Sequence, residues 1–545
     1  MACLGCRGRK SPGWFCGVWL VGILTWVAMG GLAAKPSFGQ TATPPVNQAP
    51  AMPLSATERV LELTLEDAIR LALQHNLAIE RERYSPQIEY TEVVKGQADF
   101  DPVLGVDMSI SQTKTLPDSR ILQFTQEGEE RGTTIITPFS KNGQVTPYLR
   151  QQTVIGAGYE IRFVNTRENI APASSGSRFA LVDPRYESGL ELTFTQPLLR
   201  DFGISVNTAG IRQAENATAI AEQQVLQVIL DTVFAVQSGY WDLVFRIQDL
   251  AARRGSQKLA EDFLGENKVR VELGTLAPIE LVQAEVQVKT REGEVIVAES
   301  AVQDAEDQLK EVLNLPETMG TWLLHIRPTD SPPFVPVVTV SVQEKVMEAL
   351  DQRPDFAQSQ LRIDSLEIRR QEARNQQLPR LDLQVQSRVD AFGGDYPQSV
   401  EHLGEGDGYF WSVGLRFEYP LGNRFARHEL QRRTLELKQA MVDQRQLKRT
   451  IVRLIRQAIR DIETAIKRVE VTRAATVLAQ TQLEAEQEKF RLGLSTSFVV
   501  LDFQEDLTLA RSEETRAVSD YNIALARLDQ LTGTLRYGDI TSGAK

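Results

Sequence analysis

Two hydrophobic periodicities alternate along the chain. Short segments alternate apolar and polar residues strictly, as in the run of Leu104, Val106 and Met108 with small or polar residues between them. A period of two places the apolar side chains of a strand on one face. The pattern predicts amphipathic strands within 103–197 and 381–420. Their apolar positions include Leu104, Val106, Leu192, Phe194, Leu383, Val385, Leu415 and Phe417.

This alternation fits two kinds of sheet. A soluble protein with a half-buried sheet and a membrane barrel with its apolar face in lipid give the same signal. Strands of roughly 9–11 residues also suit a tilted crossing of a bilayer. From the alternation alone, both interpretations stay open.

The second periodicity predicts very long helices. Residues 423–492 contain neither Gly nor Pro, and no proline occurs between 198 and 277. At ~1.5 Å per residue, about 70 residues form a rod of roughly 105 Å. Apolar residues in the first rod are spaced alternately by three and four, which is a coiled-coil seam rather than a cofactor site. The seam consists of Leu226, Ile229, Val233, Val236, Tyr240, Leu243, Ile247 and Leu250.

The chain also repeats itself. Residues 63–73 align with 340–350, and residues 192–198 align with 415–421. Each half reads as helix, strands and a long helical hairpin, with hairpin tips near Gly274 and Gly493. A period this long indicates an internal duplication. We therefore predict a first structural repeat over 58–320, a linker over 321–340 and a second repeat over 341–535.

The two ends differ from this pattern. Residues 1–34 place basic residues before an uncharged apolar stretch and small residues after it, which is typical of a secretory signal peptide. An uncleaved membrane anchor is the alternative, because the apolar run is long. The Pro- and Ala-rich stretch 35–57 predicts a flexible arm. Residues 536–545 are assigned to a C-terminal tail.

Composition removes several classes of function. The net charge is -12, which argues against a nucleic-acid partner. All three cysteines lie within residues 1–16, and the four histidines are scattered, so the sequence predicts no metal site and no cofactor. No nucleophile–base pair or phosphate-binding loop is evident, so we predict that the protein is not an enzyme.

The order of these elements resembles the TolC-like outer-membrane efflux protein family over about 58–535. The most specific segments are 63–69 (LTLEDAI), 195–199 (TQPLL) and the two glycine turns. The resemblance implies an α+β membrane protein built as a homotrimer of internally duplicated protomers. Each subunit would contribute four strands to one shared outer-membrane β-barrel, which a long periplasmic α-helical barrel continues.

The function implied is that of an exit duct for efflux or type I secretion. Its partners would be a periplasmic adaptor protein, an inner-membrane pump and outer-membrane lipid. It would lie in the outer membrane and extend into the periplasm. The alternative is a secreted fibrous coiled-coil interaction protein, which the duplicated strands between prolines disfavour.

The resemblance also implies candidate sites. The family's adaptor-docking tips match Leu273, Gly274, Thr275, Leu492, Gly493 and Leu494, although glycine turns alone explain the glycines. The tunnel entrance of the family carries two aspartates, of which one position holds Asp502 and the other Val499. The alternative for Asp502 is an ordinary exposed carboxylate. The partner acid of the family's entrance tethers matches Glu280, but the tyrosine and arginine positions hold Phe490 and Ser495, so that ion pair cannot form.

One segment departs from the family pattern. Residues 153–164 read as an additional strand in the first half, and a chain that returns to the periplasm must cross the membrane an even number of times. We expect this segment to belong to an extracellular hairpin. A partner strand near 133–137 is the other way to restore an even number.

Overall fold

The computed structural model describes residues 60–114, 120–124, 130–135, 139–171, 184–275, 277–315, 321–336, 341–406 and 408–534. These belong to one compact unit, Glu58–Lys545. The predicted signal peptide, N-terminal arm and C-terminal tail lie outside the described residues, as does the end of the predicted linker (337–340).

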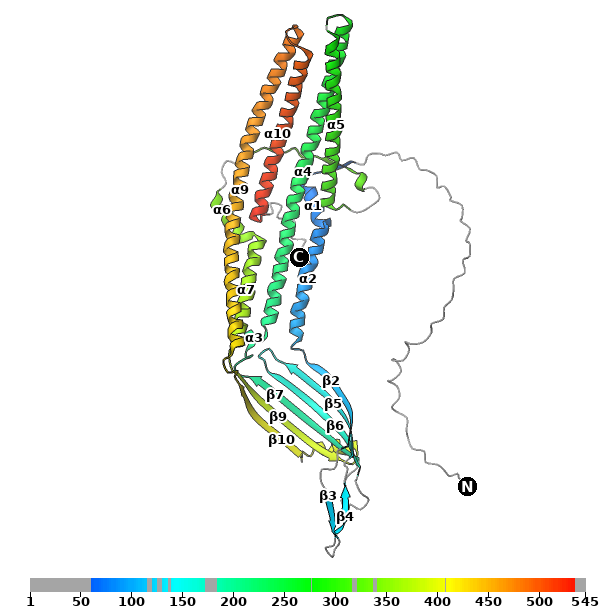
Figure 1. The fold of residues 1–545 in the computed structure, drawn as a ribbon, viewed down its shortest axis with the longest axis vertical. Helices are drawn as coiled ribbons and strands as arrows, with labels where there is room; N and C mark the ends of the chain where they lie inside the picture. The colour runs from blue at the N-terminus through cyan, green and yellow to red at the C-terminus, as the bar shows by residue number, and fades with distance from the viewer. Residues whose placement is uncertain are drawn as a thin grey trace, which may run out of the picture. The chain divides into compact units, whose positions relative to one another are not determined.

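Long helices dominate this unit (Figure 1). Helices α4 (Ala209–Glu272) and α5 (Pro278–Leu313) form one antiparallel hairpin, and α9 (Arg424–Arg491) and α10 (Ser497–Thr532) form the other. Four shorter helices pack beside α4 and α9. They are α1 (Leu65–His75), α2 (Leu77–Ala98), α6 (Val342–Gln352) and α7 (Pro354–Asn375). The short helices are α3 (Ile204–Asn207), α8 (Tyr396–Leu403) and the 3-10 turn η1 (Thr321–Leu323).

Helix starts follow capping chemistry. The Thr64 hydroxyl accepts a hydrogen bond from the Asp67 N–H at the start of α1. The Asn76 side chain accepts from the N–H groups of Ala78 and Ile79 at the start of α2. These caps satisfy backbone donors that have no partner within the helix. Together they fix where the chain begins each helix, and so where α1 is separated from α2.

A six-stranded antiparallel sheet lies at the end of the helices opposite the hairpin tips (Figure 1). Its order is β10–β9–β7–β6–β5–β2. The strands are β2 (Val103–Lys114), β5 (Phe139–Gln152), β6 (Gly158–Ala171), β7 (Arg185–Pro197), β9 (Arg380–Gly393) and β10 (Gly408–Glu418). Two small sheets complete the described strands. They pair β3 (Arg120–Phe124) with β4 (Glu130–Ile135), and β1 (Val60–Leu63) in parallel with β8 (His325–Pro328).

The strand register places the predicted apolar residues on one face. Val385 of β9 pairs with Phe194 on one side and with Val413 on the other. Because directly paired residues point to the same face, the register carries this face from β10 to β2. The side chain of Leu104 is 79% exposed, so the face has no cover there within the described chain.

The expectation for residues 153–164 is wrong. Strand β6 lies inside the sheet between β5 and β7, and the turn before it lies at the helix end of the sheet. The alternative partner near 133–137 is also wrong, because β4 pairs with β3. The strand that forms a hairpin with β6 is β5. The described sheet therefore has six strands, not the four that the family resemblance implied.

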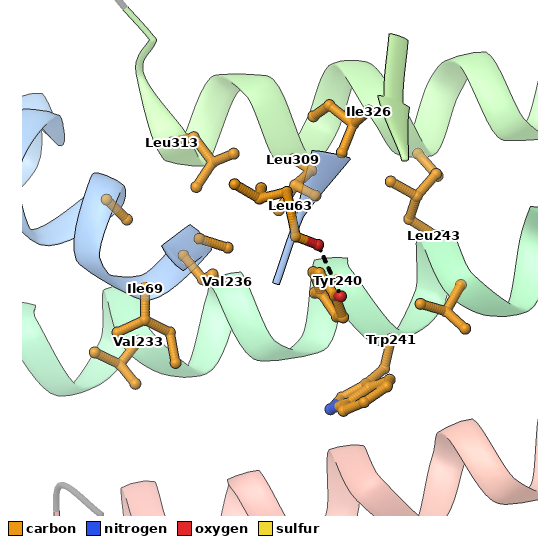
Figure 2. Close-up of a cluster of buried hydrophobic side chains, with 14 of the residues drawn as sticks. Leu63, Ile69, Val233, Val236, Tyr240, Trp241, Leu243, Leu309, Leu313 and Ile326 are labelled. Atoms are coloured by element: carbon orange, nitrogen blue, oxygen red, sulfur yellow. Dashed lines mark hydrogen bonds between the residues drawn. The ribbon is translucent and has the colours of Figure 1, made fainter. Parts of the chain in front are cut away.

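The largest apolar core lies where α4 meets α1 and α5, beside the small sheet β1–β8 (Figure 2). Val233, Val236 and Tyr240 of α4 contribute to it and belong to the predicted coiled-coil seam. By length and composition alone, α4 is the one described helix that could cross a membrane, and a third of its most apolar window is buried. The rest of that window is not buried within the described protomer and is free to pack against other helices.

Tyr240 is the polar group at the centre of this core. Its hydroxyl lies 3.0 Å from the Leu63 carbonyl oxygen, a bond visible in Figure 2. Asp330 approaches from the other side, with its Oδ2 atom 3.1 Å from the hydroxyl. Burial, and secondarily the charge of Asp330, raises the pKa of Tyr240 to about 12. The hydroxyl thus ties β1 and the chain after β8 to the long helix.

We expect Tyr240→Phe to lower the free energy of unfolding by roughly 1–3 kcal/mol, because Leu63 and Asp330 lose a buried partner. The exposed Tyr84→Phe is the control and should change little. Thermal unfolding of purified protein measures both.

The pH dependence follows from the raised pKa. A tyrosine with a folded pKa of about 12 binds its proton more tightly than one in the unfolded chain, near 10. Its contribution is complete below about pH 10 and is lost as the pH rises toward 12. The advantage of the wild type over Tyr240→Phe should therefore shrink over that window. A constant difference would show that the hydroxyl is not held in this way.

Candidate functional site

Both hairpin tips are closed by the same glycine-dependent turn. Gly274 follows α4 with φ 75°, and Gly493 follows α9 with φ 73°. In the first tip the Gly274 N–H donates to the Val271 carbonyl and the Thr275 N–H to the Arg270 carbonyl. The second tip repeats this pattern with Phe490 and Lys489 as acceptors. This pair of hydrogen bonds is the Schellman motif, which needs a residue with left-handed backbone conformation after the helix.

The tips present apolar side chains to solvent. Leu273, Leu492 and Leu494 are 72%, 66% and 75% exposed. An added Cβ at either glycine would meet no neighbouring atom within 4 Å. The glycines are therefore required by backbone conformation, whereas the leucines cover nothing within the described part of the protomer. Exposed leucines at a turn are candidates for contact with a partner.

Just behind the turns, the two hairpins pack against each other. The rings of Phe263 on α4 and Phe490 on α9 lie 5.1 Å apart. The Arg270 guanidinium lies 4.8 Å from the centre of the Phe490 ring. Leu483, Val500 and Leu501 extend this apolar cluster. Phe490, which occupies the family's tyrosine position, thus serves as a packing anchor between the tips.

Polar contacts reinforce this packing. The buried Asn267 side chain on α4 donates to the Ser497 hydroxyl at 2.9 Å. Glu280 on α5 accepts from the Ser497 backbone N–H at 3.3 Å. This N–H belongs to the first turn of α10, where the helix dipole favours a carboxylate. Glu280 therefore joins the two hairpins through a helix end rather than through an arginine.

The remaining tether position forms a local contact. Ser495 donates to the Glu486 carboxylate at the end of α9. Hydrogen bonds from Ser495 and then Lys489 lower the pKa of Glu486 below its usual value. Ser495, which stands where the family resemblance implied an arginine, therefore makes a contact within one tip and not between the two hairpins.

Arg291 is a structural residue that the sequence did not reveal. Only 3% of it is exposed. One guanidinium nitrogen donates to the Leu501 carbonyl on α10 at 2.8 Å, and another donates to the Ser256 hydroxyl on α4. Burial lowers the pKa of this guanidinium. From the sequence, Arg291 looks like an ordinary solvent-exposed arginine of a polar helix, so no sequence signal indicated that it is buried.

The structure places Asp502 on an exposed part of α10. Asp506, also exposed, follows it by four residues, which brings both carboxylates to the same side of the helix. Val499 is only partly buried. The spacing of four is visible in the sequence, but the exposure of both carboxylates on one side of α10 is defined only by the fold.

The face of the sheet opposite the apolar one carries paired charges. The Arg162 guanidinium of β6 lies 3.1 Å from the Asp107 carboxylate of β2. On the neighbouring strands, Arg388 lies 2.8 Å from Glu187. Within the described ranges, no group of three His, Cys, Asp or Glu residues could hold a metal ion.

Comparisons with known proteins agree with this architecture. Residues 346–534 match the family described as outer membrane efflux protein. The outer membrane protein TolC of Escherichia coli (strain K12) is 23% identical over 372 residues, which cover 65% of this chain and 70% of that protein.

Solved structures show the same fold. The outer-membrane channel OprN has a TM-score of 0.62 at 14% identity, covering 86% of this chain and 90% of its own. The CmeC outer membrane channel of Campylobacter jejuni has a TM-score of 0.61 at 14% identity, covering 88% of each chain. In its efflux-protein region and in its fold, the chain therefore resembles the TolC-like outer-membrane efflux proteins, which are passive channels and not enzymes.

Proposed function

We propose that three copies of this chain form an exit duct that works with a periplasmic adaptor and an inner-membrane pump. As an outer-membrane efflux channel, the protein lies in the outer membrane and extends into the periplasm. The observation that carries the proposal is the sheet. It combines an exposed apolar face, a charged opposite face and two edge strands whose outer edges have no partner among the described residues. We assign 58–320 and 341–535 as its structural repeats.

The open edges support a shared barrel. A sheet edge facing lipid leaves backbone N–H and C=O groups unsatisfied, which costs several kcal/mol for each group. Strand β2 leads away from the helices and β10 returns to them, so the edges of adjacent copies would meet antiparallel. Three copies around one axis remove all open edges. The partly buried apolar surface of α4 would then pack against neighbouring helices in a tunnel.

Lipid contact by the apolar face is tested by arginine substitution. We expect Phe194→Arg combined with Leu415→Arg to abolish trimer assembly, since each arginine at the bilayer midplane costs roughly 2–4 kcal/mol. Thr193→Arg with Ser412→Arg is the matched control on the opposite face. Trimers are counted on gels of outer-membrane extracts.

Equal assembly of the two double variants would count against a membrane barrel. Failure of the control alone would place the lipid on the charged face.

The hairpin tips are the proposed adaptor contacts. The exposed Leu273, Leu492 and Leu494 would enter apolar grooves on the adaptor, and the turns would present them at a fixed angle. The tips can act together because Phe263, Phe490 and Ser497 join the two hairpins. No energy source is needed in this chain, because the pump supplies it.

We expect Leu273→Ser with Leu494→Ser to reduce export strongly while trimers stay intact. The two side chains are mostly exposed, so their loss should cost the trimer little stability. Val297→Ser, an exposed apolar site on α5 about 28 Å along the helix from its start, is the control. Export from intact cells and adaptor cross-linking are the readouts. Full export by the tip variant would remove the docking role.

Asp502 and Asp506 are proposed to line the tunnel entrance. Threefold symmetry would bring three copies of each carboxylate to one constriction, where they attract cations and repel anions. Asp506 would supply the second negative charge of each subunit, because Val499 stands at the position of the family's other aspartate.

In planar bilayers, Asp502→Asn with Asp506→Asn should reduce cation selectivity and weaken block by multivalent cations. Glu484→Gln, an exposed carboxylate on α9, is the control. The difference should be largest in dilute salt and should fade toward 1 M, where the Debye length is about 3 Å. Unchanged selectivity would place both carboxylates outside the pore.

A further inference from the structure

We infer that the hairpin β5–β6 is part of the barrel wall, so that three copies form an eighteen-stranded barrel from three six-stranded sheets. This inference rests on the proposed trimeric duct and adds the width of its outer-membrane passage. The alternative is a twelve-stranded wall of β2, β7, β9 and β10, with β5–β6 displaced from it.

Continuous pairing on both sides integrates the hairpin. Strand β2 pairs with β5 from Val103 opposite Arg150 to Lys114 opposite Phe139. Strand β6 pairs with β7 from Gly158 opposite Thr195 to Glu168 opposite Arg185. A twelve-stranded wall would require both ladders to break and β2 to pair with β7 instead. Unless they found new partners, the backbone groups of the displaced hairpin would be left unsatisfied, which lipid does not tolerate.

The hairpin also continues both faces of the sheet. On the apolar face, Leu149 and Ile161 fill the row between Leu104 and Leu192. On the charged face, Tyr148 and Arg162 fill the row between Gly105 and Glu191. A strand pair displaced from the wall would not be required to place apolar and charged residues in register with these two rows.

Specific side-chain contacts fix this arrangement. The Arg162–Asp107 ion pair at 3.1 Å reaches from β6 across β5 to β2. The Tyr148 ring lies directly over Gly105, where a Cβ would come within 2.4 Å of it. Glycine at this position therefore lets the aromatic ring of the hairpin cross onto β2.

The turn of the hairpin is docked at the helix end of the sheet. The Gly203 N–H donates to the Ile155 carbonyl at 3.1 Å. Gly156 has φ 93°, and a Cβ there would lie 2.4 Å from the Asp201 carbonyl oxygen. The Gln151 side chain donates to the Phe100 carbonyl at 2.8 Å, beside the start of β2. The hairpin thus spans the same height as its neighbours.

The consequence is a wider passage. Barrel diameter grows roughly in proportion to strand number, so eighteen strands give about 1.5 times the diameter of twelve. The lumen would be lined by the charged face, including the Arg162–Asp107 pair. The outer-membrane section would then admit bulkier cargo than a twelve-stranded wall.

Deletion of residues 115–171 tests the inference. It removes the small β3–β4 sheet together with β5 and β6, and it joins β2 to β7 through 172–184. It would place Leu104 beside Leu192, with both still on the apolar face. In electron cryo-microscopy along the threefold axis, we expect eighteen strands for the full chain and twelve for the variant, with a diameter ratio of about 1.5.

A full-chain trimer with twelve strands in its wall would overturn the inference and leave the proposed duct standing. Particles that contain one chain would overturn both.

Cysteine labelling keeps the test decisive if the deletion variant does not assemble. The sequence has no cysteine beyond residue 16, so Phe163→Cys and Thr166→Cys can each be labelled alone in native outer membranes. These positions lie on the apolar and charged faces of β6. A water-soluble maleimide should label Thr166→Cys and spare Phe163→Cys until detergent is added. Equal labelling of both would show a hairpin surrounded by water and would contradict its place in the wall.

Discussion

The need to satisfy backbone hydrogen bonds at the sheet edges governs the rest of this molecule. Within the described chain, β2 and β10 have one neighbour each, and an open edge cannot persist in hydrocarbon. The apolar face of the sheet meanwhile favours a hydrocarbon environment. Both demands are met when identical copies close a ring. In the proposed duct, the meeting of β10 of one copy with β2 of the next follows from this one constraint.

The helical end follows a different logic, in which two hairpins are fastened to each other within one protomer. Apolar packing of Phe263 on Phe490 supplies contact area, and Arg291 and Glu280 add directional bonds from α5 to α10. Replacing an ion pair by a bond to a helix N-terminus keeps the tips together without an arginine. Within the described protomer, apolar packing and directional hydrogen bonds therefore both hold the two hairpins together near their tips.

The sequence predicted the elements with strong periodicity. The heptad seam around Tyr240 forms the core of α4, and the alternation at Leu192 and Leu415 marks one sheet face. It failed at β5, where Gly143 and Pro147 interrupt the alternation. A strand between two others is held mainly by backbone hydrogen bonds, and these depend little on which side chains the strand carries. Arg291 and Asp506 were missed because their roles depend on contacts or on a face that only the fold defines.

We propose that the duct is built from three identical chains in the outer membrane. Native mass measurement on protein extracted from purified outer membranes is the decisive experiment. We expect particles that contain three chains. Particles of one chain, or recovery of the protein in the soluble periplasmic fraction without detergent, would contradict it.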